Sequence, residues 1–180
     1  MELLLVPGMS IKNKHWIEAV ADNFRPHFSN VQSLHYSHWD SGHNAFNFEL
    51  EASKLIKKME NSKKFVVFAK SAGAILALQA IHDKKLTPQA CIFVGSAVGW
   101  ARETQKDVDL WLRGYSLPTL FIQKTSDPAI SFEDLKKTLI LSKAKNYKLL
   151  QLPGDNHDYE DIELLVNSSL EFVNELDLKT

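Results

Sequence analysis

The sequence predicts an α/β protein built as a three-layer sandwich, with a parallel sheet of six strands covered by helices on both sides. Six short apolar runs alternate along the chain with longer segments whose apolar residues recur at helical spacing. Most of these runs are hydrophobic at consecutive positions, as expected for strands buried on both faces. Right-handed crossovers between parallel strands then place helices on each side of the sheet.

Each predicted strand is a short apolar run. The predicted strands are residues 3–6, 31–36, 65–69, 90–94, 117–123 and 148–152. Pro7 and Gly8 end the first run, which is a strong turn signal. The second run is a weaker strand than the first. Pro153 and Gly154 follow the sixth run.

Each predicted helix follows a strand and carries apolar residues on one face. The predicted helices are residues 11–24, 46–59, 72–82, 104–112, 131–142 and 162–176. In the first, Ile17, Val20 and Phe24 lie at helical spacing, and Pro26 closes the segment. In the second, Phe46 and nearby apolar residues fall along one face. No linker or repeat divides the chain, so we expect one domain spanning residues 1–180.

Composition narrows the class of protein. The chain is 44% hydrophobic, which allows a substantial core, and its formal net charge is −1. Acidic and basic residues are mixed along the sequence, which argues against a dedicated nucleic-acid or anionic-membrane surface. The single cysteine, Cys91, cannot form an intramolecular disulfide, as is typical of a reducing compartment. The N-terminal apolar run is too short for a signal sequence or membrane span, so we expect a cytoplasmic protein.

A serine lies where the third predicted strand meets the next helix. Residues 69–73 read Ala-Lys-Ser-Ala-Gly. A tight strand-to-helix turn requires small residues two before and two after the serine, and Ala69 and Gly73 satisfy this. The hydroxyl of Ser71 would then be exposed beside a helix N-terminus, where backbone N–H groups favour developing negative charge. The alternative interpretation is that Ser71 only caps the helix.

This pentapeptide resembles the nucleophile elbow of the α/β-hydrolase family, Gly-x-Ser-x-Gly. The resemblance implies a triad in the chain order Ser, Asp or Glu, His, each after a strand. Asp127 follows the fifth predicted strand and His157 the sixth. The resemblance therefore implies that Ser71 is the nucleophile, His157 the general base and acid, and Asp127 the group that orients His157.

Other interpretations of these residues remain open. Asp127 precedes a proline, as turn residues often do, and His157 could be an ordinary surface histidine. Asp155 and Asp158 flank His157 and are alternative acids. We rank them below Asp127 because residues so close in sequence do not easily reach the far side of the imidazole.

The family resemblance extends to the oxyanion hole and the sheet. It implies that the backbone N–H groups of Met9 and Ala72 are the oxyanion donors. It also implies the strand order 2-1-3-4-5-6 and a minimal fold with little or no lid, because residues 97–116 offer only about one helix. The chain departs from the family where Ala69 replaces glycine and where Lys70 and Pro7 occupy positions that are often histidine.

Two tryptophans and a histidine-rich segment are further candidates. Trp39 and Trp100 each follow a predicted strand, and we expect them to line the substrate site. The alternative is that they pack in the core. The segment 35–43 also contains the metal-binding residue types His35, His38, Asp40 and His43. Their spacing matches no known zinc motif, and residues 35 and 38 of a strand would face opposite ways. We therefore predict no metal site and no cofactor, with a zinc site as the alternative.

The function expected from these features is hydrolysis of a carboxylic ester or thioester through an acyl-enzyme on Ser71. Amide hydrolysis uses the same groups. The expected partner is a small-molecule acyl substrate. The alternative is a non-catalytic binding module that keeps the fold. No glycine-rich nucleotide-binding motif follows any predicted strand.

Overall fold

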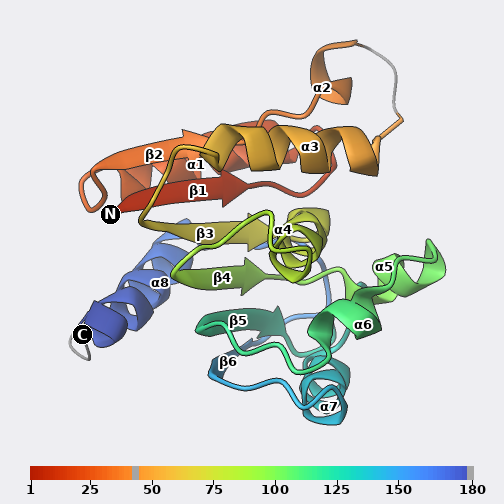
Figure 1. The fold of residues 1–180 in the computed structure, drawn as a ribbon. Coiled ribbons are helices and arrows are strands. Elements are labelled where there is room, and N and C mark those ends of the chain that lie inside the picture. Colours follow the sequence, from red (N-terminus) through yellow and green to blue (C-terminus); the bar gives the residue numbers. More distant parts are fainter. Residues whose placement is uncertain (42–44, 178–180) are drawn as a thin grey trace.

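The computed structural model describes residues 1–41 and 45–177, and it contains one six-stranded sheet in the order β2-β1-β3-β4-β5-β6 (Figure 1). The strands are β1 (Glu2–Val6), β2 (Asn30–Ser33), β3 (Phe65–Lys70), β4 (Ala90–Val94), β5 (Thr119–Lys124) and β6 (Tyr147–Leu152). Every neighbouring pair is parallel. The predicted number, direction and order of the strands are confirmed.

Helices cover both faces of this sheet. They are α1 (Asn13–Phe24), α2 (His38–Ser41), α3 (Phe48–Met59), α4 (Ala72–His82), α5 (Val98–Glu103), α6 (Val108–Leu112), α7 (Phe132–Leu141) and α8 (Ile162–Asp177). Helices α1 and α8 pack on one face, and α3, α4 and α7 on the other, which gives the predicted three layers (Figure 1).

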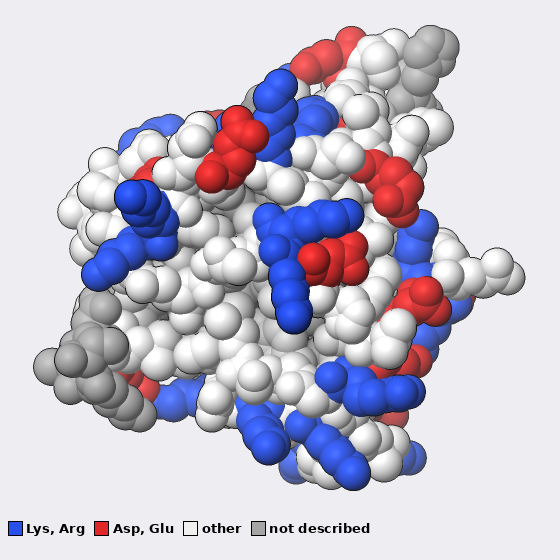
Figure 2. Space-filling model, viewed as in Figure 1, with Lys and Arg blue, Asp and Glu red and all other residues white. Residues whose placement is uncertain are grey.

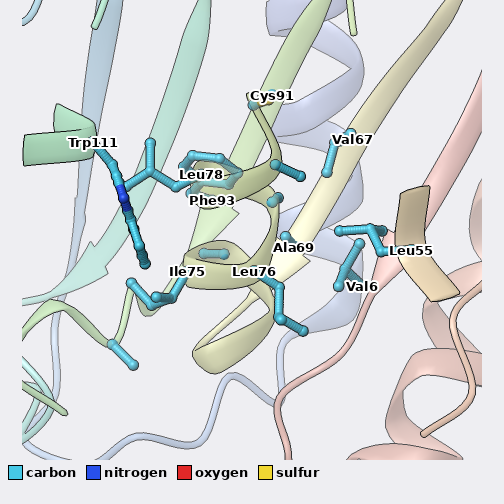
Figure 3. Close-up of a cluster of buried hydrophobic side chains, with 14 of the residues drawn as sticks. Val6, Leu55, Val67, Ala69, Ile75, Leu76, Leu78, Cys91, Phe93 and Trp111 are labelled. Atoms are coloured by element: carbon cyan, nitrogen blue, oxygen red, sulfur yellow. The ribbon is translucent and has the colours of Figure 1, made fainter. Parts of the chain in front are cut away.

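Alternate residues of each strand divide between two cores. In β3, Val66 and Phe68 pack with α1 and α8, whereas Val67 and Ala69 pack with α3 and α4. This alternation follows from the pleat of a strand, and it explains why the strands read as continuous apolar runs. Figure 3 shows the core around α4, where Ile75 and other apolar side chains of the helix lie over β3 and β4.

The chain differs from the prediction after β2. This strand ends at Ser33, not at residue 36. Tyr36 turns inward instead, where its side chain is fully buried and its hydroxyl bonds to the carbonyl oxygen of Pro7. The short helix α2, which the sequence did not indicate, begins two residues later.

The second difference lies between β4 and β5. The predicted single helix at 104–112 is replaced by α5 and α6. Gln105 adopts a left-handed conformation with φ of 56°, and the Lys106 N–H bonds back to the Ala101 carbonyl at 2.8 Å. A left-handed residue followed by such a backward hydrogen bond is a common way for a helix to end. Helix α5 therefore stops before α6 begins.

Charged side chains of both signs are interspersed over the face shown in Figure 2. Within the described part of the chain, no helix combines the length and apolar character needed to cross a membrane.

Candidate active site

The carboxyl ends of all six strands meet at one edge of the sheet, on the right in Figure 1. Ligands bind at this edge in open α/β sheets. Ser71 follows β3, Asp127 follows β5 and His157 follows β6. The topology therefore brings these three residues, which are far apart in sequence, to the same edge.

Ser71 occupies a strained turn between β3 and α4. Its φ is 56° and its ψ is −125°, a region that residues other than glycine rarely adopt. The Ser71 N–H bonds to the Val94 carbonyl at 2.9 Å, which secures the turn to β4. A Cβ added to Gly73 would lie 2.4 Å from the carbonyl oxygens of both Val6 and Pro7. Only glycine fits there, which is the small-residue requirement that the sequence suggested.

His157 joins the serine to the aspartate. Its Nε2 lies 2.8 Å from the Ser71 Oγ, and its Nδ1 lies 2.8 and 2.9 Å from the two carboxylate oxygens of Asp127. A carboxylate accepts hydrogen bonds, so Nδ1 carries the hydrogen and Nε2 is free to accept the serine proton. Of the three candidate acids, it is Asp127 that bonds to the imidazole, not Asp155 or Asp158.

Asp127 is buried, with an exposed fraction of 3%. Burial alone would raise the pKa of this carboxyl group, but hydrogen bonds from His157, Tyr159 and the Ala129 N–H outweigh it, so the pKa lies below its ordinary value. The Ala129 N–H donates to Oδ1 at 2.8 Å. The carboxylate is thus held ionised and fixed in orientation.

Tyr159 is a component of this site that the sequence did not reveal. Its hydroxyl donates to Asp127 Oδ2 at 2.7 Å and accepts from the Lys124 N–H at 3.0 Å. Burial, together with the charge of Asp127, raises the pKa of this hydroxyl, so it remains a donor. The indole N–H of Trp16 donates to the Tyr159 carbonyl at 2.7 Å, which ties the loop after β6 to α1.

The loop after β1 lies directly against the nucleophile. A Cβ added to Gly8 would lie 3.2 Å from the Cβ of Ser71. Met9 follows in this loop with 36% of its surface exposed, and Ala72 is the first residue of α4. The two residues named as oxyanion donors therefore lie on the segments that flank Ser71.

Lys70 is buried on the α1 side of the sheet, with 5% exposed. Its ammonium donates to the Asn13 Oδ1 at 2.9 Å and lies 4.6 Å from the ring centre of Trp16. Burial lowers the pKa of this amine, while the negative charges of Asp158 and Asp127 oppose the shift. The residue before the nucleophile thus contributes a buried cation close to the site.

The two candidate tryptophans have different surroundings. Trp39 is 8% exposed and belongs to the core on the α4 side. Its indole N–H donates to the Met9 carbonyl at 3.0 Å. Trp100, on α5, is half-buried and lies 6.4 Å from the rings of Phe46 and Phe48.

The histidine-rich segment makes separate contacts. His35 Nε2 bonds to Asp40 Oδ2 at 2.7 Å, whereas His38 Nε2 bonds to the Met9 carbonyl at 2.7 Å. His38 begins α2 and is not in a strand. The described residues contain no group of three side chains placed to hold a metal ion. His43, the fourth residue of that hypothesis, lies outside the described residues.

Comparison with known proteins adds to this picture at the level of fold. Neither protein-family models nor curated proteins match the sequence. Solved structures do match. The mouse alpha/beta hydrolase domain-containing protein 10 superimposes with a TM-score of 0.75 at 13% identity, over 97% of this chain and 90% of its own.

Two bacterial structures give similar results. Est1E from Butyrivibrio proteoclasticus, solved with ferulic acid bound, has a TM-score of 0.72 at 16% identity, over 97% of this chain and 88% of its own. A YdeN-like hydrolase from Pectobacterium atrosepticum has a TM-score of 0.69 at 16% identity, with 97% and 91% covered. The sheet order and these superpositions agree: the chain has the α/β-hydrolase fold, in a minimal form.

Proposed function

We propose that this protein hydrolyses carboxylic esters or thioesters through an acyl-enzyme on Ser71. The observation that carries the proposal is the continuous hydrogen-bonded path from Ser71 Oγ through both nitrogens of His157 to Asp127. A serine hydroxyl is a weak nucleophile unless an adjacent base removes its proton. The fold likeness to esterases and other hydrolases supports the same class of reaction.

In the first half of the reaction, Ser71 Oγ attacks the carbonyl carbon while His157 Nε2 takes the hydroxyl proton. Negative charge develops on the carbonyl oxygen, where the N–H groups of Met9 and Ala72 stabilise it. Asp127 stabilises the charged imidazole and holds its tautomer. The carbon–oxygen or carbon–sulfur bond then breaks, and the leaving group receives the proton from His157.

In the second half, His157 removes a proton from water, and the resulting hydroxide attacks the acyl carbon. The bond between this carbon and Ser71 Oγ then breaks, His157 returns the proton to Oγ, and the carboxylic acid leaves. These steps require no cofactor. We propose Trp100, which is half-buried on α5 at this edge of the sheet, as a contact for the substrate. We propose that the substrate is a small acyl compound. We also propose a cytoplasmic location, in keeping with the single, buried cysteine.

The proposal is tested by assaying p-nitrophenyl esters and acyl thioesters of short and medium chain length. We expect turnover by the wild-type protein and none above background for Ser71→Ala. Asp127→Asn should keep the fold and lower kcat by about 10⁴-fold, because the imidazole is then held in the wrong tautomer. Equal activity in Ser71→Ala would contradict the proposal.

A further inference from the structure

Three side chains from one short segment hold the loop that follows β1. The hydroxyl of Tyr36 donates to the Pro7 carbonyl at 2.5 Å. His38 Nε2 and Trp39 Nε1 both contact the Met9 carbonyl, at 2.7 and 3.0 Å. A carbonyl only accepts, so Nε2 of His38 carries the hydrogen. We call these three side chains, Tyr36, His38 and Trp39, the carbonyl clamp.

The two carbonyls held by the clamp lie on either side of one peptide group. The Met9 N–H belongs to the peptide between Gly8 and Met9, and the Pro7 and Met9 carbonyls belong to the peptides before and after it. Each peptide unit is planar, so restraining both neighbours restrains the direction of the N–H between them. Gly8 packs against the Cβ of Ser71, so this peptide group lies at the nucleophile.

Packing fixes the start of this loop, where Pro7 and Gly8 are buried, and leaves Met9 less restrained. Met9 is 36% exposed and Ile11 is 52% exposed, so their side chains do little to anchor the backbone. Gly8 is buried, and a Cβ added to it would lie 2.8 Å from Nδ2 of Asn13, so the loop becomes exposed only from Met9 onward. The hydrogen bonds to the Pro7 and Met9 carbonyls therefore supply restraint at the point where packing becomes weaker.

The clamp is itself rigid. Tyr36 is fully buried, and its ring stacks on His38 with centroids 5.8 Å apart and meets Trp39 edge-on at 5.1 Å. The backbone between them is secured from α3, because the Ser37 N–H donates to Oε1 of the buried Glu51 at 2.8 Å. The position of the clamp is therefore set by the fold and not by the loop that it holds.

We propose that the carbonyl clamp orients the Met9 N–H as an oxyanion donor, which makes Tyr36, His38 and Trp39 positioning residues. This inference rests on the proposed hydrolase function. The clamp acts through the backbone, so its loss weakens stabilisation of the transition state more than binding of the substrate. The effect should fall on kcat and leave KM within about two-fold.

Four variants separate positioning from general stability. His38→Met removes the donor while keeping side-chain volume, and His38→Gln restores an N–H near the position of Nε2. Trp39→Phe removes the indole N–H but keeps an aromatic ring. His35→Gln is the matched control, because the His35 ring also contacts Trp39 edge-on, but its Nε2 bonds to Asp40 and not to the loop after β1.

The readout is the hemiketal that an aryl trifluoromethyl ketone forms with Ser71, observed by ¹⁹F NMR as a function of pH. The hemiketal ionises at lower pH when the oxyanion is well stabilised. We expect His38→Met and Trp39→Phe to raise this ionisation midpoint by about one pH unit and to lower kcat about 10- to 100-fold, less than the 10²–10³ for loss of a whole donor. His38→Gln and His35→Gln should match wild type.

The clamp proposal is overturned if His38→Met and Trp39→Phe keep the wild-type midpoint and kcat while only their melting temperatures fall. In that case the three hydrogen bonds stabilise the fold alone. Failure of the hydrolase proposal looks different: the folded wild-type protein then forms no hemiketal on Ser71, and the clamp proposal falls with it.

Discussion

The hydroxyl of Tyr159 donates to Asp127 Oδ2 at 2.7 Å, and the same oxygen lies 2.9 Å from Nδ1 of His157. One carboxylate oxygen therefore serves two donors from the same loop. Because the Tyr159 hydroxyl also accepts from the Lys124 N–H, it links the loop after β6 to the end of β5. The orientation of the carboxylate depends on this tyrosine.

Tyr159→Phe should slow the reaction without unfolding the protein. Hydrogen bonds to charged groups contribute about 1.5–3 kcal/mol, so we expect kcat/KM for an activated ester to fall roughly 10- to 100-fold. Tyr147→Phe is the matched control, since Tyr147 begins β6 at the opposite end of the strand. Equal rates in the two variants would show that the Tyr159 hydroxyl does not support Asp127.

Gly73→Ala should damage both stability and activity. The added methyl group would lie 2.4 Å from two backbone carbonyl oxygens, and overpacking of this kind costs about 1–3 kcal/mol. The loop that carries Met9 would have to move, so the rate at which a fluorophosphonate labels Ser71 should also fall. Gly114→Ala is the comparison, because nothing lies within 4 Å of the added methyl although its φ is 68°. It should lower the melting temperature and leave the labelling rate unchanged.

The lowered pKa of Asp127 leads us to expect that the free energy of unfolding decreases at acid pH. Its pKa is lowered in the folded protein, so the folded state binds fewer protons than the unfolded chain at low pH. The stabilisation is complete above the unfolded value, near pH 4, and is lost as the pH falls through the folded pKa. Urea unfolding between pH 3 and 7 should show a larger loss in the wild type than in Asp127→Asn, which keeps the carboxyl groups of Glu2 and Asp40, whose pKa values are also lowered. Parallel curves for the two proteins would contradict the assignment.

The buried amine of Lys70 leads us to expect that stability depends on pH in the alkaline range as well. The pKa of its amine is lowered by burial, so the folded protein releases this proton at a lower pH than the unfolded chain does. The free energy of unfolding of the wild type, relative to Lys70→Met, should therefore rise as the pH increases through the folded pKa, and level off above about 10.5. Urea unfolding from pH 7 to 10.5 measures this. Lys12 is exposed and lines the same surface pocket as Lys70, so Lys12→Met controls for loss of charge. A flat difference would contradict the prediction.

Much of the fold could be predicted because its signals are local. Consecutive apolar residues mark strands buried on both faces, and residues such as Val66 and Val67 do pack on opposite sides of the sheet. The turn at Ser71 could be predicted for a similar reason. Its need for a small residue at Gly73 is local in sequence, although the carbonyls that impose it belong to Val6 and Pro7.

What could not be predicted depends on contacts between distant segments. The early end of β2 follows from burial of Tyr36, whose hydroxyl meets a carbonyl 29 residues away. The role of Tyr159 depends on the conformation of the loop after β6, which the spacing of apolar residues does not predict. The sequence suggested His38 as a candidate metal ligand, whereas in the structure its Nε2 bonds to a backbone carbonyl. A histidine in sequence does not indicate which group it will bond.

Covalent labelling of the purified protein with a fluorophosphonate tests the central claim most directly. Intact mass and peptide mapping are compared for the wild type and Ser71→Ala. We predict one stoichiometric adduct, located on Ser71 and absent from the variant, because His157 activates this hydroxyl. A folded wild-type protein that acquires no adduct, or acquires one elsewhere, would contradict the claim and favour a non-catalytic binding module.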